Sequence, residues 1–119
     1  MVRVFILTGL VWAIGAVQGF AQPVQFFESL QDIPLMPGLI EQVDDTVFFD
    51  KPDGRVVESV ADMAGFSQEA VESYYMSALP QFGWENAGGG RFNRGGESLE
   101  LVFEGADDLG ILRVLVQPR

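Results

Sequence analysis

The chain contains no cysteine and no histidine among its 119 residues. Without thiols it forms neither disulfides nor thiolate metal sites, and a lipid-modified cysteine is excluded. Without imidazole, the Ser-His-Asp and Cys-His mechanisms are excluded as well, and the commonest general base at neutral pH is missing. Chemistry by paired carboxylates or by the one lysine, Lys51, stays open.

Basic residues are scarce. Seven Lys and Arg stand against seventeen Asp and Glu, which gives a formal net charge of −10 at pH 7. Such a field repels nucleic-acid phosphates and anionic lipid surfaces, so we expect no nucleic-acid partner. The simplest interpretation of the acidic excess is that it keeps a small exported protein soluble.

One long apolar run is present, and it lies at the N-terminus. Fourteen apolar residues, 4–17, follow the single charge of Arg3, and the small residues Gly19 and Ala21 then occupy the −3 and −1 positions of a cleavage site. This order is that of a secretory signal peptide, with Gln22 as the new N-terminus. A spanning helix needs about 20 apolar residues. We therefore predict that residues 1–21 are a signal peptide and that the protein is periplasmic or secreted. An uncleaved leader is the alternative, and only then would the chain contact a membrane.

The 98 residues that follow are enough for one domain. Residues 22–45 are predicted to be an extended, proline-containing segment, because Pro34 and Pro37 remove backbone donors and favour extended geometry before them. We expect this segment to lie across the domain formed by residues 46–119 and to insert Ile33, Leu35 and Leu39.

A β-hairpin is predicted within residues 46–61. The apolar, β-prone runs 47–49 and 56–57 flank a turn that contains Pro52, Asp53 and Gly54. Proline presets φ for the first central turn position, aspartate tolerates the second, and glycine accepts a positive φ.

A helix is predicted over residues 67–79. Ser67 is a favourable N-cap, and Glu69 places negative charge in the first turn. The apolar face recurs at spacings of three and four and comprises Val71, Tyr74, Tyr75, Ala78 and Leu79. Pro80 ends or kinks the helix, and Gly83 is available to close its last turn.

Three antiparallel strands are predicted to follow. The first spans residues 84–93 with a flexible interruption at the glycines 88–90, the second spans 97–104, and the third spans 110–117. The second alternates with the period of a half-buried strand. The expected fold is therefore a two-layer α+β domain of order β-β-α-β-β-β, with one main helix packed on an antiparallel sheet.

Two local patterns resemble known sequences. Residues 33–39 read I-P-L-M-P-G-L, and residues 74–84 read Y-Y-M-S-A-L-P-Q-F-G-W. Their order and spacing, with the R-F-N-R-G-G-E-S-L stretch at 91–99, resemble an uncharacterised family of small exported Gram-negative bacterial proteins. The resemblance implies a bacterial source, a fold and an export route, and it supplies no catalytic residue.

The apolar part of the N-terminal segment is the candidate surface for a ligand or partner. Its residues are Phe26, Phe27, Ile33, Leu35, Met36 and Leu39. If exposed, they would form a patch of the kind that marks interaction sites. The alternative, which we favour, is that they cover the sheet, because a small domain needs that burial.

No catalytic residue, metal site or cofactor is predicted. The aspartates around the hairpin turn lack EF-hand spacing, and Lys51 lies among them. Glu100 and Glu104 would lie about 13 Å apart on one strand, which is too far for a glycosidase pair.

The leading hypothesis is a non-enzymatic exported interaction or structural module with another periplasmic or envelope protein as partner. A carrier of a small apolar ligand is the second hypothesis, and a carboxylate hydrolase is the third. The carrier's ligand would be lined by Val71, Tyr75, Leu79, Leu99, Leu101 and Phe103.

Overall fold

The computed structural model describes residues 23–105 and 109–119. The predicted signal peptide, 1–21, lies outside the described residues. The elements that lie wholly within these ranges follow in the order β1 (Ile40–Glu41), η1 (Val43–Asp45), β2 (Val47–Lys51), β3 (Gly54–Asp62), α1 (Gln68–Ala78), η2 (Leu79–Phe82), β4 (Glu85–Gly88), β5 (Arg91–Arg94), β6 (Glu97–Glu104) and β7 (Ile111–Pro118), where α is an α-helix, η a 3-10 helix and β a strand.

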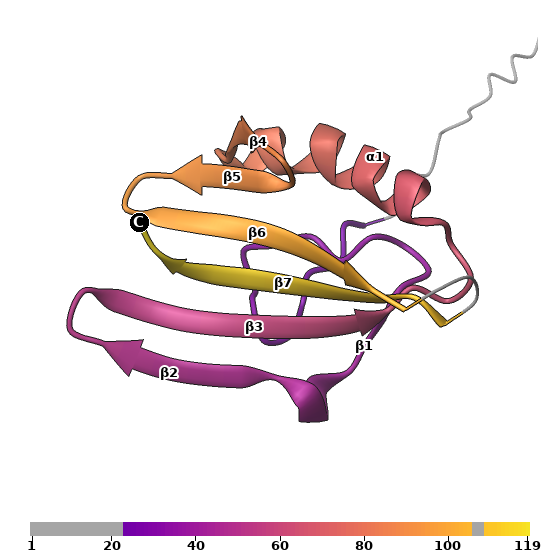
Figure 1. The fold of residues 1–119 in the computed structure, drawn as a ribbon, viewed down its shortest axis with the longest axis horizontal. Coiled ribbons are helices and arrows are strands. Elements are labelled where there is room, and N and C mark those ends of the chain that lie inside the picture. Colours follow the sequence, from indigo (N-terminus) through magenta and orange to yellow (C-terminus); the bar gives the residue numbers. More distant parts are fainter. Residues whose placement is uncertain (1–22, 106–108) are drawn as a thin grey trace, which may run out of the picture.

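All strand pairs are antiparallel and form one sheet of order β1-β3-β7-β6-β5-β4 (Figure 1). β2 pairs with the first half of β3, and the two-residue β1 pairs with the last two residues of β3. β7 lies between β3 and β6, as its continuous apolar run indicates.

One face of this sheet is covered. Residues 23–39 pass behind β6 and β7 in Figure 1, and α1 extends along the β4–β5 side. A single apolar core joins the segment, the helix and the inner face of the sheet. Its largest fully buried side chains are Trp84, Tyr75, Phe27, Phe92, Leu30 and Ile33. The class is therefore α+β, as predicted, although the sheet contributes more of the structure than the single helix.

The predicted hairpin is confirmed. β2 and β3 pair without a register shift from Val47↔Glu58 to Lys51↔Gly54, so Pro52 and Asp53 form a two-residue turn. A side chain on Gly54 would be strained, because its φ is 146°.

The predicted helix is confirmed with its cap. The Ala70 amide donates to Ser67 Oγ at 3.1 Å, which satisfies one free donor of the first turn. After Leu79 the chain tightens into η2 and ends at Gly83, whose φ of 90° favours glycine. The next residue, Trp84, turns into the core and is almost completely buried.

The predicted strand 84–93 was wrong. It is two strands, β4 and β5, that pair with each other. The glycines 88–90 all have positive φ, so they reverse the chain as a turn where an interrupted single strand was expected. This reversal and the short β1 change the predicted order β-β-α-β-β-β.

Candidate functional site

The candidate surface of the N-terminal segment is mostly core. Phe27 and Ile33 are fully buried and Leu39 is nearly so. Leu35 and Met36 are half-buried against the same cluster, while Phe26 stays partly exposed. A partner can reach the buried residues only if the segment lifts from the sheet. In this structure, these residues therefore pack in the core.

Tyr75 fixes the proline-containing part of this segment to the helix. Its hydroxyl donates to the Pro34 carbonyl at 2.8 Å and accepts from the Met36 amide at 3.1 Å. Burial raises the pKa of this phenol well above its ordinary value, so the hydroxyl stays protonated and able to donate. The two sequence patterns that carry the family resemblance are thus in direct contact.

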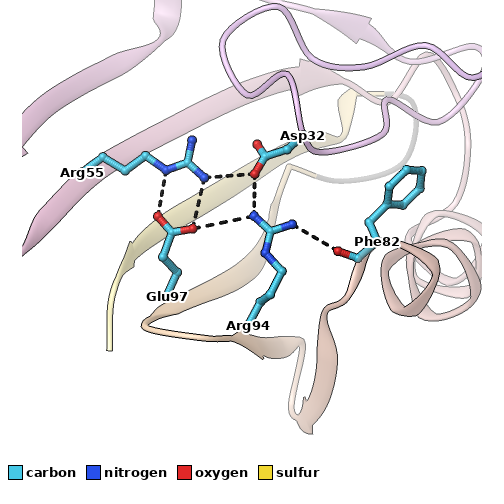
Figure 2. Close-up of polar contacts among 5 residues, drawn as sticks. All are labelled: Asp32, Arg55, Phe82, Arg94 and Glu97. Carbon is cyan, nitrogen blue, oxygen red and sulfur yellow. Dashed lines mark hydrogen bonds and ion pairs between the residues drawn. The ribbon is translucent and has the colours of Figure 1, made fainter.

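A second set of contacts joins the segment to the sheet through charges. Asp32 accepts hydrogen bonds from Arg94 at 2.5 Å and from Arg55 at 3.1 Å, as Figure 2 shows. Arg55 also binds both oxygens of Glu97, at 2.8 and 3.1 Å, and Arg94 donates to the Phe82 carbonyl. Two guanidinium groups therefore alternate with two carboxylates, and their formal charges cancel.

The charge cluster Asp32–Arg55–Arg94–Glu97 has a structural role. Burial alone raises the pKa of Asp32, but the hydrogen bonds from Arg94 and Arg55 outweigh it and hold this pKa below its ordinary value of 3.8. Arg94 also stacks on Trp84, 4.2 Å from the ring centroid. Every charged group of the cluster therefore has a partner of opposite charge within it.

The space between the helix and the sheet is filled by the chain itself. Val71, Tyr75, Leu79 and Leu99 are fully buried in the common core, Leu101 is nearly so, and Phe103 packs against them. These are the six residues expected to line a carrier's cavity.

A groove lies beside that core, and we call it the α1–β6 groove. Its volume is about 510 Å³. One wall is the exposed face of α1, the floor is the glycine turn 88–90, and the other wall is the edge of β6. The groove is lined by Gln68, Glu72, Met76, Asn86, Gly88, Gly89, Gly90 and the β6 residues 100–103.

The groove exposes backbone as well as side chains. β5 pairs with β6 only as far as Arg91↔Glu100, and the Leu101 amide then donates to the Gly90 carbonyl at 2.9 Å. Backbone groups alternate in direction along a strand, so the N–H and C=O of Phe103 also point away from β7. In the part of the chain that the structure describes, no strand pairs with residues 102–104 on that side.

The side chains around the groove are mainly acidic and amide. Glu72 lies on the α1 side of the groove. Glu100 lies at its β6 edge, but Leu99 and Leu101 point into the core, so the Glu100 side chain lies on the opposite face of the sheet, where it pairs with Arg91 at 3.7 Å. The amide of Asn86 donates to the sulfur of Met76 at 3.1 Å, and Met76 is half exposed. The walls therefore suit an occupant that carries positive charge and some apolar surface.

Metal ligands do not gather in the described ranges: no group of three or more His, Cys, Asp or Glu side chains could hold a metal ion there. No helix among these residues is long and apolar enough to cross a membrane.

No family model matches the chain, and neither the curated proteins nor the solved structures contain a match to it.

The α1–β6 groove was not predicted from the sequence. One signal was present, because Gln68, Glu72 and Met76 recur at intervals of four along the side of the helix next to its apolar face. The unpaired end of β6 was hidden by the wrong assignment of residues 84–93 as one strand.

Proposed function

We propose that this protein is a non-enzymatic, exported interaction module that binds an extended segment of a partner protein in the α1–β6 groove. The observation that carries the proposal is that the N–H and C=O of Phe103, which no strand among the described residues pairs, face the α1–β6 groove of about 510 Å³. A β-strand is the ligand whose own backbone satisfies such groups.

The bound segment would extend the sheet at one end only. The groove follows β6 from Glu100 to Phe103, which is about 10 Å at ~3.3 Å per residue. Such a segment contacts Phe103 through its backbone and places alternate side chains toward α1. Specificity therefore depends on Glu72, Met76 and Gln68, and the backbone contacts are independent of sequence.

Charge favours a basic segment. Glu72 lines the groove from α1, and the whole chain carries a formal charge of −10. The overall field draws a cationic partner toward the surface, and the Glu72 carboxylate then selects Lys or Arg locally. The same field disfavours nucleic acids and anionic lipids as partners.

The location belongs to the same proposal. The predicted leader at residues 1–21 would deliver the chain to the periplasm or beyond, so the partner would be another periplasmic or envelope protein. The carrier and hydrolase hypotheses stay predictions, and no contact in the described structure favours either.

The test is a selection of random peptides on the immobilised protein. We expect enrichment of segments in which Lys or Arg alternates with apolar residues. Glu72→Lys should weaken the binding of the selected peptides by about tenfold, because it places a lysine next to the Lys or Arg side chains of the peptide. Glu69→Lys is the matched control, since Glu69 is exposed on the same helix and does not line the groove. Equal binding to both variants, or no enrichment at all, would remove the proposal.

A further inference from the structure

A different edge of the sheet has its own unpaired strand. β2 pairs with β3 on one side, and within the described residues no strand lies on its other side. All five residues of β2 are exposed, including Val47 at 46%, Phe48 at 59% and Phe49 at 48%. Three consecutive exposed apolar residues on a free edge are a ready template for another strand.

Natural edge strands are usually blunted by charges, proline or bulges, and in β2 the charges, Asp50 and Lys51, lie only at the end next to the turn. Its five residues contain no proline, and its register with β3 has no bulge. Because Lys51↔Gly54 closes a two-residue turn, Lys51, Phe49 and Val47 bond to β3. The backbone groups of Phe48 and Asp50 therefore point outward, away from the sheet.

The sequence of β2 is complementary to itself. In a two-fold antiparallel pair centred on Phe48, Phe48 lies opposite its own copy and Val47 lies opposite Phe49. The same register brings Lys51, the one lysine of the chain, beside the acidic η1 of the other copy, where Asp44 and Asp45 lie. A pair centred on Phe49 would instead place Phe48 opposite Asp50 and Lys51 opposite Val47.

We propose that a second copy of this chain occupies the β2 edge, with the two strands antiparallel about Phe48. The two sheets then join into one, and their covered faces lie on the same side, because the two-fold axis is perpendicular to the sheet. The α1–β6 groove of each copy stays free, since β2 and β6 are separated by β3 and β7. This interface is independent of the proposed peptide-binding function.

The pairing is expected to be weak and reversible. Each copy carries a formal charge of −10, and this like charge opposes association. At physiological ionic strength the Debye length is about 8 Å, so charges far from the interface are largely screened. The contacts of the two β2 strands then decide the outcome.

Cysteine substitution tests the register without interference, because the chain has no cysteine of its own. Opposed residues of a hydrogen-bonded antiparallel pair lie about 5.5 Å apart at Cα, which suits a disulfide. Phe48→Cys should therefore form a covalent dimer under mild oxidation. Phe49→Cys should stay monomeric, because its copies lie diagonally, about 7–8 Å apart. Cross-linking of Phe49→Cys, or of neither variant, would overturn the proposal.

The second test is sedimentation equilibrium. The full sequence is expressed, and the protein that accumulates is purified and measured. The protein should associate to a dimer in the high micromolar range. Phe48→Lys should raise the dimer dissociation constant about tenfold or more, because it sets two lysines opposite each other. Val24→Lys changes another exposed apolar residue by the same chemistry and should leave association unchanged. A protein that stays monomeric at every concentration, or that loses association equally in both variants, would contradict the proposal.

Discussion

The Tyr75 hydroxyl donates to the Pro34 carbonyl at 2.8 Å, and 41 residues separate the two along the chain. The same oxygen accepts from the Met36 amide, so one side chain satisfies two backbone groups of a segment that the prolines keep out of regular structure. This contact joins α1 to the covering segment and holds the second layer of the fold in place.

Removing that hydroxyl should destabilise the protein without emptying the core. In Tyr75→Phe the ring remains, but the Pro34 carbonyl and the Met36 amide lose their partner, so we expect a loss of about 1–3 kcal/mol in the free energy of unfolding. Urea denaturation followed by circular dichroism measures it. Tyr74→Phe is the control, because Tyr74 is only half-buried and its hydroxyl makes no hydrogen bond among the described residues. An equal loss in both variants would contradict the assignment.

Asp32 should make the stability depend on acid pH. Its pKa is lower in the folded protein than the ordinary 3.8, so its ionised form stabilises the fold at neutral pH, and that contribution is lost as pH falls from about 4 through the lowered pKa. Asp32→Asn should cost about 1 kcal/mol at pH 7, because the side chain is partly exposed.

Unfolding curves from pH 7 to pH 2 check this expectation. The difference in unfolding free energy between wild type and Asp32→Asn should shrink toward zero at the acid end. Asp53→Asn, in the exposed hairpin turn, should follow the wild type throughout. A difference that stays constant with pH would show that the charge of Asp32 is not the cause.

Replacing Arg94 by lysine should destabilise the protein. The Arg94 guanidinium binds Asp32 and the Phe82 carbonyl and stacks on Trp84, and a single ammonium group does not reproduce this geometry. We expect Arg94→Lys to cost about 1–2 kcal/mol. Arg91→Lys, at a largely exposed arginine with one 3.7 Å contact, should stay within about 0.5 kcal/mol of wild type. Thermal unfolding of the two variants side by side decides between these outcomes.

The leader should be removed on export. Expression of the full chain in a Gram-negative host should give a periplasmic protein whose first residue is Gln22. Intact mass spectrometry and N-terminal sequencing measure this directly. Recovery of the chain with Met1 or Val2 still present, in the membrane fraction, would favour the uncleaved anchor instead.

Local signals in the sequence predicted the elements that local chemistry controls. Ser67 caps the helix, Pro52 and Asp53 make the turn, and the alternation around Leu99 and Leu101 gives β6. These depend on neighbours within a few residues, so periodicity and turn chemistry are sufficient to find them.

Long-range pairings were beyond that method. Asp32 and Arg94 bind each other although they are 62 positions apart in the sequence, and the spacing of neither residue indicates its partner. The free end of β6 depends on where β5 stops, and that point depends on how three consecutive glycines turn. A glycine run is compatible with both a flexible interruption and a tight reversal, so the sequence alone left the groove undetected.

Hydrogen exchange at the Phe103 amide tests the central claim most directly. In the protein without peptide this N–H faces the α1–β6 groove, whereas the Val102 amide bonds within the sheet toward β7. A peptide selected on the groove should slow exchange at Phe103 by at least about tenfold, because the amide gains a backbone acceptor, and should change Val102 little. Binding of such a peptide with unchanged exchange at Phe103 would contradict the account.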